Sequence, residues 1–356
     1  MTQTIMIMAG GTGGHVFPGI AVASYLSEKG WKVIWLGTKN GMEANLVPKH
    51  GFEIEWIKFS GLRGKGILRW VMLPVSILYA CGQSISIIRR RKPNVVIGMG
   101  GFVSFPGGLM ASLLNRPLII HEQNSIAGLA NRVLARIADR VLIAFPKVFP
   151  ESLQPLLTGN PIRKEMTVVA EPRLRFADRS GPLKILVVGG SLGARALNQI
   201  MPQVIQALPQ SARPQVTHQA GVKHFDSLQE AYANAGVKAE LLPFIDNMAQ
   251  RYADCDLIIC RSGALTVAEI AAIGVASILI PFPYAVDDHQ TYNARFLTEA
   301  GAAELIPESQ LSAAKLVDLL VGFTREKLLR MAEAARKLGQ PDATRHVAEV
   351  CMEFAR

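Results

Sequence analysis

Residues 5–14, IMIMAGGTGG, and residues 185–193, ILVVGGSLG, follow one pattern at two places in the chain. Each begins with a short apolar run, continues with a Gly-Gly pair, a hydroxyl residue and a further glycine, and leads into a stretch that favours a helix. A glycine-rich turn between a buried strand and a helix is typical of the first βα unit of a Rossmann-like domain. The repeated pattern therefore predicts two such domains in succession.

Short apolar runs follow each copy and alternate with longer amphipathic stretches, which is typical of βαβ units and a parallel sheet. The runs are KVIWLG (32–37), EIEWIKF (53–59), VVIGM (95–99), LIIHE (118–122) and RVLIAF (140–145) in the first half, and VTHQA (216–220), ELLPF (240–244), LIIC (257–260) and ASILIPF (276–282) in the second. The sequence thus predicts an α/β fold with two parallel sheets. Ligands of such sheets bind at the carboxyl ends of the strands.

The composition fits two packed domains and an anionic partner. The chain has 356 residues, 49% of them hydrophobic, and 38 Lys and Arg against 28 Asp and Glu give a net charge of +10. This excess favours a nucleotide, a phosphorylated lipid or a nucleic acid as partner. The four cysteines form neither a C-x-x-C pair nor a zinc spacing, and the amino terminus lacks the features of a signal peptide. We therefore expect reduced thiols in a protein that stays in the compartment where it is made.

The loop Gly10–His15 has the small residues of an anion-binding turn, in which backbone N–H groups and a helix amino terminus approach a phosphate. Neither glycine loop contains the G-x-G-x-x-G dinucleotide fingerprint or the Gly-Lys-Ser/Thr of a P-loop. A plain phosphate cradle has no use for a proton acceptor such as His15. The loop is therefore a nucleotide clamp, a catalytic loop or only a tight turn. A third glycine-rich stretch, residues 98–108, either admits part of a bulky substrate or lets a helix pack closely on the sheet.

In the second half, the strand at 257–260 is followed by Arg261-Ser262-Gly263 and by a helix that begins near Ala264. The N–H groups of that first helical turn suit a phosphate or a base edge. Glu269 lies one to two turns farther on, where its carboxylate suits the two hydroxyls of a ribose. The alternative is that Glu269 is a solvated helix residue.

Two further polar stretches also have alternative interpretations. In Asp287-Asp288-His289-Gln290, Gln290 either reaches a sugar hydroxyl or belongs to a loop and an N-cap. Asp254-Cys255-Asp256 spells D-x-D, but it precedes a strand instead of following its carboxyl end. We interpret it as polar residues that flank the strand, so the sequence predicts no metal and no cofactor.

Residues 70–88, WVMLPVSILYACGQSISII, carry no charge and approach the length of a membrane span, but Pro74, Gly82, Gln83 and three serines argue against one. Cations lie on both sides, namely Arg63, Lys65, Arg69, Arg89, Arg90, Arg91 and Lys92. The segment is either an apolar surface that lies on an anionic bilayer or a core helix whose basic end complements its own dipole.

Nine separated blocks extend from residue 5 to beyond Asn293: GGTGGHVFPG, LVPKHG, SGLRGKG, GMGG, HEQN with AGLAN, GNPIR, GGS-x-GAR, CRSGALTVAEIAA and DDHQ. Together, and in this order, they resemble the MurG family of bacterial glycosyltransferases, which add N-acetylglucosamine to lipid I. The resemblance implies a GT-B architecture, with two Rossmann-like domains around a deep cleft. Residues 1–163 would form the acceptor- and membrane-facing domain, with the helix at 341–356 packing back on it, and residues 164–340 would bind UDP-N-acetylglucosamine.

The resemblance also implies the donor contacts, which map onto Thr12, Gly13, Gly14, Asn124, Arg163, Ser191, Ile245, the run Ala264, Leu265, Thr266, Val267, Ala268 and Glu269, and Gln290. Glu269 would bind the ribose, while Ser191 and the amides of 264–266 would bind the diphosphate. Ile245 would contact the uracil, and Gln290 with Asn124 the sugar. Arg163 would neutralise charge on the departing UDP.

The implied reaction is displacement at the anomeric carbon of the donor by the C4 hydroxyl of N-acetylmuramic acid in undecaprenyl-pyrophosphoryl-MurNAc-pentapeptide, with inversion to a β-1,4 bond. Such a step needs a base for the hydroxyl proton and a cation or dipole for UDP. His15 is the expected base; its alternatives are to orient the loop or to bind the acceptor diphosphate. Glu122 and Asp288 are the next carboxylates to test.

A lipid-borne acceptor favours peripheral attachment of residues 60–92 to an anionic membrane surface. The resemblance implies the cytoplasmic face of the inner membrane as the location. UDP-N-acetylglucosamine and lipid I are the expected substrates, other cell-wall or division proteins are candidate partners, and no nucleic acid is expected.

Three other classes explain less of the sequence. A UDP-N-acetylglucosamine 2-epimerase of the same fold would use the donor site without a lipid acceptor, and would not need the basic apolar stretch. An NAD-dependent oxidoreductase would need the missing fingerprints and ribose-binding acids. A nucleic-acid-binding module would need aromatic residues among its basic ones, which are instead diluted over both halves.

Overall fold

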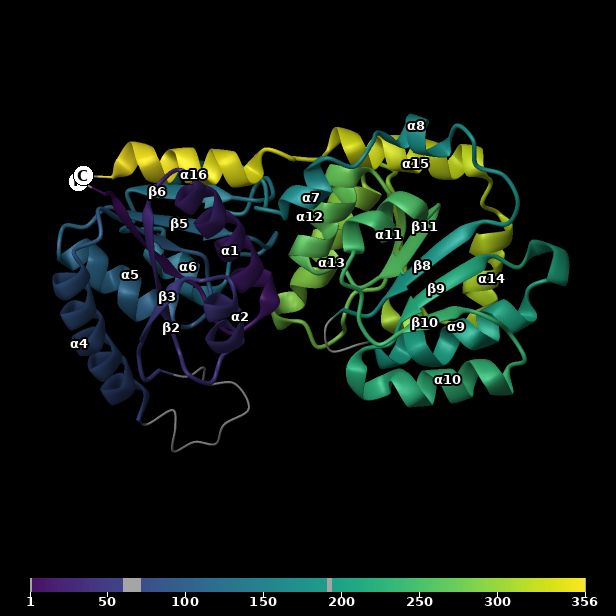
Figure 1. The fold of residues 1–356 in the computed structure, drawn as a ribbon, viewed down its shortest axis with the longest axis horizontal. Coiled ribbons are helices and arrows are strands. Elements are labelled where there is room, and N and C mark those ends of the chain that lie inside the picture. The colour runs from purple at the N-terminus through teal and green to yellow at the C-terminus, as the bar shows by residue number, and fades with distance from the viewer. Residues whose placement is uncertain (1, 60–71, 191–193, 356) are drawn as a thin grey trace. The chain divides into compact units, whose positions relative to one another are not determined.

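The computed structural model describes residues 2–59, 72–190 and 194–355, and the chain divides into two compact units (Figure 1). Unit 1 comprises Met1–Arg163 and Pro341–Arg356, and unit 2 comprises Lys164–Gln340. Each unit contains one parallel sheet with helices on its faces. The predicted α/β class with two Rossmann-like sheets is confirmed.

The sheet of unit 1 has the order β3-β2-β1-β4-β5-β6-β7, and all its pairs are parallel. Its strands are β1 (Thr4–Met8), β2 (Lys32–Gly37), β3 (Glu53–Trp56), β4 (Val95–Gly98), β5 (Leu118–Glu122), β6 (Arg140–Ile143) and β7 (Leu156–Leu157). The first six were expected from the apolar runs. The two-residue β7 was missed because it is too short to show a period.

Alternation along β1 divides the core of unit 1 into two layers. Ile5 and Ile7 face one cluster with α1 (Gly13–Glu28) and α16 (Ala343–Phe354), whereas Met6 and Met8 face a second cluster with α4 (Leu73–Arg91) and α5 (Ser104–Leu113). The remaining α-helices described in this unit are α2 (Glu43–Lys49) and α6 (Leu129–Leu134). Residues 5–8 of β1 are buried on both faces and all four are apolar, which is typical of a central parallel strand.

The carboxyl-terminal helix α16 packs against α1 in unit 1, although the preceding 177 residues, 164–340, form unit 2 (Figure 1). Val347, Ala348 and Cys351 are buried in the same cluster as Ile5 and Trp35. The Thr344 hydroxyl donates a hydrogen bond to the carbonyl of Ile162 (3.1 Å). The burial of this apolar face therefore ties the end of the chain to the first unit.

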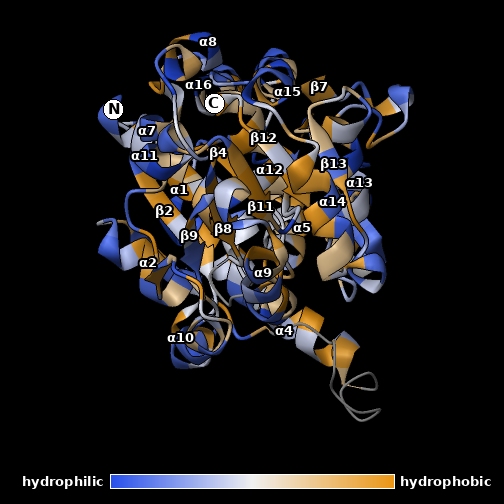
Figure 2. Cartoon of the chain, turned by 90° about the vertical axis from the view of Figure 1, so that its right-hand side faces the viewer, coloured by the Kyte–Doolittle hydropathy of each residue, from blue (hydrophilic) through white to orange (hydrophobic). Residues whose placement is uncertain are grey.

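The sheet of unit 2 has the order β10-β9-β8-β11-β12-β13. Its strands are β8 (Lys184–Val188), β9 (Gln215–Gln219), β10 (Glu240–Leu242), β11 (Leu257–Cys260), β12 (Ala276–Leu279) and β13 (Ala303–Leu305). β13 was not expected, because AEL carries no strong apolar run. Figure 2 shows β8, β11 and β12 largely in orange, and apart from Lys184 the residues of these strands are buried.

The helices of unit 2 connect these strands and cover both faces. They are α7 (Lys164–Thr167), α8 (Pro172–Phe176), α9 (Arg195–Ala207), α10 (Phe225–Asn234), α11 (Met248–Asp254), α12 (Ala264–Ile273), α13 (His289–Thr298), α14 (Ala313–Val321) and α15 (Arg325–Lys337). Ile185 and Val187 of β8 lie in one cluster with α9, α10 and α14. The helix expected near Ala264 begins there.

Candidate active site

In unit 1 the loops after β1, β4 and β5 are neighbours, because these three strands are adjacent in the sheet. The strand order reverses between β1 and β4, since β2 and β3 lie on one side and β5 to β7 on the other. Open α/β sheets bind ligands at the carboxyl ends of the strands at such a reversal. The loop Gly10–His15 lies at this point of unit 1, which makes it the centre of the candidate site.

His15 lies in the first turn of α1 and is half-buried. Its Nδ1 lies 2.8 Å from Oε1 of Gln123, which directly follows β5. Nε2 of Gln123 lies 3.0 Å from Nδ1 of His121, and Nε2 of His121 lies 2.9 Å from the carbonyl oxygen of Gly159. His121 and Gln123 are buried, and burial lowers the pKa of His121 to about 4. The half-exposed histidine is therefore supported by a buried polar chain.

Gly100, in the third glycine-rich stretch, makes room for this contact. A Cβ atom at residue 100 would lie 2.7 Å from Nδ1 of His15, and the backbone has a φ of +96°, which favours glycine. A Cβ atom on Gly101 would lie 2.2 Å from the carbonyl oxygen of Gly10. A Cβ atom on Gly107 of α5 would lie 2.4 Å from the sulfur of Met8 in β1, so the structure supports the interpretation in which residues 98–108 let a helix pack closely on the sheet.

Glu43, which the sequence analysis does not predict as a site residue, contacts the glycine loop through its side chain. Its buried carboxylate accepts hydrogen bonds from the backbone of Gly11 (3.1 Å) and from the backbone and hydroxyl of Thr38 (3.0 and 2.8 Å). No short-range pattern marks this residue, because it contacts Gly11 only after β1 and β2 pair. It holds the Gly10–His15 loop in place.

Glu122, an alternative base, is occupied by backbone and amide donors. Its two oxygens accept hydrogen bonds from the backbone N–H groups of Asn124 and Gly128 and from the side chains of Asn124 and Asn131, at 2.9 to 3.3 Å. The side chain is 1% exposed. Glu122 therefore organises the loop 122–131 and lies in a poor position to take a proton from a substrate.

Of the other predicted contacts of unit 1, four follow the carboxyl ends of strands β1 and β5, and one is the last residue of segment 1–163. Thr12 is the exposed N-cap of α1, and Gly13 and Gly14 form its first turn. Asn124 is half-buried beside Glu122. Arg163 is the last residue of the first segment of unit 1 and is half-buried.

In unit 2 the strand order reverses between β8 and β11. Arg261, Ser262 and Gly263 connect β11 to α12. The amino terminus of α12 therefore lies at the carboxyl end of β11. Leu265, Thr266 and Ala268 are half-buried, whereas Ala264 and Val267 are buried. Arg261 is engaged by Glu308 (2.5 Å) and by the carbonyls of Ile280 and Pro281. The candidate anion-binding feature here is therefore the first turn of α12 and not the arginine before it.

Glu269 and Gln290 belong to neighbouring helices, α12 and α13, which pack together. Glu269 is 6% exposed and accepts a hydrogen bond from the hydroxyl of Tyr252 (3.2 Å), so it is not a freely solvated helix residue. Gln290 accepts one from the backbone N–H of Phe282 (2.9 Å). Ile245 is buried after β10, and Ser191 lies outside the described residues.

Asp288 lies at the N-cap of α13 with a φ of +51°, and it accepts a hydrogen bond from the hydroxyl of Thr291 (2.7 Å). The position fits the N-cap interpretation of the 287–290 tetrad, but the Asp288 side chain accepts no hydrogen bond from a backbone N–H of the first turn. The carboxylate is exposed. It belongs to unit 2, whereas His15 belongs to unit 1.

Asp256 of the D-x-D stretch is a buried structural carboxylate. It contacts Arg179 (2.6 Å), accepts a hydrogen bond from the backbone of Lys184 (2.8 Å) and lies 3.5 Å from Arg325. Asp254 is exposed and accepts a hydrogen bond from Gln250. Among the described residues, no group of three or more His, Cys, Asp or Glu side chains is suited to a metal ion.

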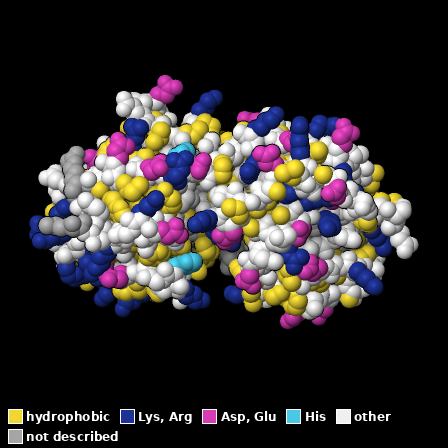
Figure 3. All heavy atoms as spheres, turned by 45° about the horizontal axis from the view of Figure 1, so that its top comes forward, with side chains coloured by type: hydrophobic (Ala, Val, Ile, Leu, Met, Phe, Trp, Pro, Cys, Tyr) yellow, Lys and Arg dark blue, Asp and Glu magenta, His cyan; other side chains and the backbone are white. Residues whose placement is uncertain are grey.

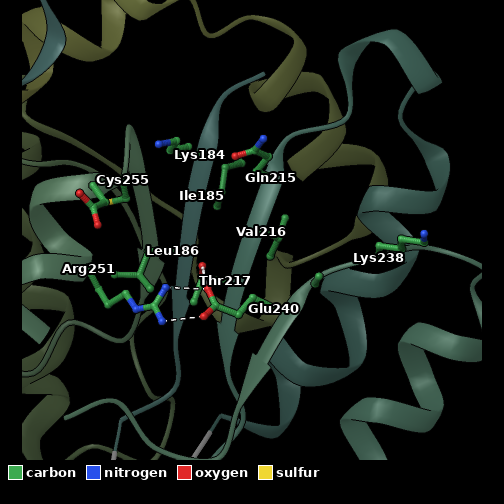
Figure 4. A pocket seen from close by; sticks show the side chains of 12 residues that line it. Lys184, Ile185, Leu186, Gln215, Val216, Thr217, Lys238, Glu240, Arg251 and Cys255 are labelled. Atoms are coloured by element: carbon green, nitrogen blue, oxygen red, sulfur yellow. Dashed lines mark hydrogen bonds and ion pairs between the residues drawn. The ribbon is translucent and has the colours of Figure 1, made fainter. Parts of the chain in front are cut away.

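A cavity of about 440 Å³ opens in unit 2 beside β8, β9 and β10 (Figure 4). It is lined by Lys184, Gln215 and Glu240, the first residues of these strands, so it lies toward their amino ends. Figure 4 shows that Glu240 is engaged by Arg251 (2.6 Å). Since ligands of parallel sheets bind at the opposite ends, this cavity is a weaker candidate than the two reversal points.

Sequence comparison places both halves of the chain in one family. The model of the glycosyltransferase family 28 N-terminal domain matches residues 5–143, and that of the glycosyltransferase family 28 C-terminal domain matches residues 184–347. A curated relative from Nitrosospira multiformis is 59% identical over 99% of both chains, and one from Dechloromonas aromatica is 55% identical over the full length of both. Both are named UDP-N-acetylglucosamine–N-acetylmuramyl-(pentapeptide) pyrophosphoryl-undecaprenol N-acetylglucosamine transferase.

Solved structures agree with this placement. The crystal structure of MurG from Acinetobacter baumannii is 40% identical, with a TM-score of 0.88 over 99% of both chains. A UDP-GlcNAc 2-epimerase from Neisseria meningitidis, solved with UDP-GlcNAc, has a TM-score of 0.66 at 12% identity over 99% of this chain and 100% of that one, which is a likeness of fold alone. The chain belongs to glycosyltransferase family 28 and, within it, to the MurG family.

Proposed function

We propose that the protein transfers N-acetylglucosamine from UDP-N-acetylglucosamine to the C4 hydroxyl of N-acetylmuramic acid in undecaprenyl-pyrophosphoryl-MurNAc-pentapeptide, with inversion, in peptidoglycan synthesis. The observation that carries the proposal is full-length identity of 55–59% to relatives that bear the name of this transferase. The sheet reversal in each unit adds two candidate substrate-binding edges. The 2-epimerase alternative rests on fold likeness at 12% identity and has no further support.

In the proposed reaction unit 1 handles the acceptor and unit 2 the donor. His15 takes the proton of the attacking hydroxyl, since it is half-exposed at the reversal point of unit 1, whereas Glu122 is buried and engaged by four N–H donors. The new glycosidic bond forms as the bond between the anomeric carbon and the diphosphate breaks. The donor contacts that the proposal assigns to unit 1 are Thr12, Gly13, Gly14, Asn124 and Arg163, of which Arg163 neutralises charge on the departing UDP.

The donor binds to unit 2 in this proposal. The N–H groups and partial positive charge at the start of α12 favour the diphosphate, both when bound and as it departs with an additional negative charge. Ser191 and the amides of 264–266 hold the diphosphate, Ile245 contacts the uracil, and Gln290 with Asn124 contacts the sugar. Glu269 accepts hydrogen bonds from the ribose hydroxyls.

Glu269→Gln is expected to raise the KM for UDP-N-acetylglucosamine about tenfold with little change in kcat, because it weakens a contact made in both ground and transition states. Tyr252→Phe is the matched control, because it removes the hydroxyl that donates to Glu269 and leaves the carboxylate. Initial rates at varied donor concentration measure both constants. An unchanged KM in Glu269→Gln would contradict the proposed contact between Glu269 and the ribose.

We also propose that α4 attaches the protein to an anionic membrane surface, on the cytoplasmic face of the inner membrane. One face of α4 is buried through Ala80, Cys81 and Ile88, whereas Val75, Leu78 and Tyr79 are 57%, 72% and 53% exposed. No helix within the described ranges is long and apolar enough to cross a membrane. An amphipathic helix of this kind lies in the bilayer interface.

The cations around α4 are not equivalent. Arg90 and Arg91 at its carboxyl end are paired with Glu55 at 2.7 and 2.6 Å, which reduces their contribution to a membrane contact. Arg63, Lys65 and Arg69 lie outside the described residues. On the face of unit 1 displayed in Figure 3, Lys and Arg side chains gather at the left-hand end.

Leu78→Glu is expected to weaken binding to vesicles rich in anionic lipid several-fold at low salt, because it places a carboxylate in the apolar stripe. Leu174→Glu in α8 is the matched control, since Leu174 is also 72% exposed but lies in unit 2. Co-sedimentation with vesicles measures the binding. Equal loss in both variants, or no loss in Leu78→Glu, would contradict the role of α4.

The proposed function is tested by sugar transfer from UDP-N-acetylglucosamine to a short-chain analogue of lipid I, with product identified by mass. We expect one N-acetylhexosamine to be added in a β-1,4 bond. A reaction without the acceptor analogue is the control for donor hydrolysis and for epimerisation at C2 of the donor sugar. The absence of transfer by the wild-type protein would refute the proposed function.

A further inference from the structure

Two side chains, those of Gln123 and His121, connect His15 to the backbone carbonyl of Gly159 through a chain of hydrogen bonds. Oε1 of Gln123 lies 2.8 Å from Nδ1 of His15, Nε2 of Gln123 lies 3.0 Å from Nδ1 of His121, and Nε2 of His121 lies 2.9 Å from the oxygen of Gly159. Gln123 and His121 are 1% and 0% exposed. Because the chain is buried, each polar atom in it depends on its neighbour for a partner.

The direction of every bond follows from the last acceptor. A carbonyl oxygen only accepts, so Nε2 of His121 carries the hydrogen. Burial lowers the pKa of His121 to about 4, so the ring is neutral and its Nδ1 is an acceptor. Gln123 must therefore turn its NH2 group toward His121, where it also donates to the His121 carbonyl (3.2 Å). Its oxygen then faces His15.

We propose that Gln123 and His121 are positioning residues that hold neutral His15 with the hydrogen on Nδ1, so that the lone pair of Nε2 is available to the attacking hydroxyl. This inference rests on the proposed function, in which His15 is the base. The imidazole of His15 donates from Nδ1 to Oε1 of Gln123, and its Nε2 lies on the other side of the ring.

The proton balance of the step is simple in this arrangement. The acceptor hydroxyl gives its proton to Nε2 of His15, its oxygen forms the bond to the anomeric carbon, and the bond to UDP breaks with both electrons on the diphosphate. His15 becomes an imidazolium that keeps its Nδ1 hydrogen bond to Gln123. The amide oxygen accepts that bond in both states, so the chain need not rearrange.

Gly100 lies against the hydrogen bond between His15 and Gln123. A Cβ atom at this position would lie 2.7 Å from Nδ1 of His15 and 3.3 Å from Oε1 of Gln123. Only a residue without a side chain leaves both atoms in hydrogen-bond contact. Glycine at position 100, in the β4–α5 loop, thus leaves the room that the hydrogen bond between His15 and Gln123 needs.

The direct test is the tautomer of His15 in the wild-type protein without substrates. Two-bond ¹⁵N–¹H correlation spectra of histidine-labelled protein at about pH 8, above the ordinary histidine pKa of about 6.5, distinguish a protonated Nδ1 from a protonated Nε2. The His15 signals among the seven histidines are identified by their loss in His15→Ala. We expect hydrogen on Nδ1. A wild-type ring with its hydrogen mainly on Nε2 would overturn the proposal.

Variants test the kinetic consequence. Gln123→Met removes the acceptor and is expected to shift His15 toward the other tautomer and to lower kcat by about 10- to 100-fold, with the KM for the donor changed by less than about twofold. Gln123→Glu keeps an acceptor for Nδ1 of His15 but removes the N–H donor to His121, so it is expected to retain the wild-type tautomer of His15 and to recover part of the rate. Unchanged kcat in Gln123→Met would also overturn the proposal.

His121→Phe and His218→Phe form a matched pair. Both histidines are fully buried, and both ring nitrogens of each are hydrogen-bonded, but His218 lies in unit 2 between Asn198 and Tyr232. We expect lower kcat only in His121→Phe, with rates expressed per folded molecule. An equal effect in the two variants would assign His121 a structural role only. Because the spectra need no substrate, failure of the proposed function and failure of this inference give different results.

Discussion

His15→Ala is expected to lower kcat for sugar transfer by about 10²- to 10⁴-fold, the contribution of a positioned general base. The side chain lies at the strand-order reversal of unit 1, and its ring is held by Gln123. The KM for UDP-N-acetylglucosamine is expected to change little, since the base acts on the acceptor hydroxyl. Initial rates with the short-chain lipid I analogue measure the effect.

His50→Ala is the control for this prediction. His50 is also a histidine of unit 1, but it is exposed at the end of α2. Its removal is expected to leave both constants unchanged, and thermal unfolding would show whether either variant loses stability. Near-normal turnover by His15→Ala would remove His15 as the base while leaving the proposed function intact.

Asp256→Ala is expected to lower the free energy of unfolding by about 3–5 kcal/mol, the cost of breaking a buried ion pair and leaving one partner behind. The Asp256 carboxylate is 0% exposed and contacts Arg179 and the backbone N–H of Lys184. Loss of the carboxylate leaves the guanidinium without its counter-charge and the N–H without its acceptor. Denaturant or thermal unfolding, followed by circular dichroism, measures the change.

Asp254→Ala is the matched control from the same D-x-D stretch. Asp254 is exposed and contacts only Gln250 among the interactions described for it, so we expect a change within about 0.5 kcal/mol. A chelator is expected to leave the wild-type transfer rate unchanged. Chelator-sensitive transfer together with an undamaged fold in Asp256→Ala would instead indicate a metal role for this stretch.

Local patterns were sufficient for most of the fold. The apolar runs predicted the central strands, because the part of a strand that is covered on both faces is apolar, as residues 5–8 of β1 are. Two edge strands were missed, because β7 has only two residues and the AEL of β13 carries no strong apolar run. The long uncharged segment was identified, but its buried and exposed faces became distinct only when α4 packed on the sheet.

Some features of the candidate site were also predictable from local sequence, and others were not. The sequence by itself determined the two parallel-sheet units, the glycine loop with His15 and the start of the helix at Ala264, because these depend on residues close together in the chain. Only the tertiary structure decided that Gln123, 108 residues from His15, contacts its ring and that Glu43 accepts a hydrogen bond from the backbone of Gly11. The physical reason is that strand order, set by burial of the whole sheet, brings the loops after β1, β4 and β5 together, and no local period in the chain records which strands become neighbours.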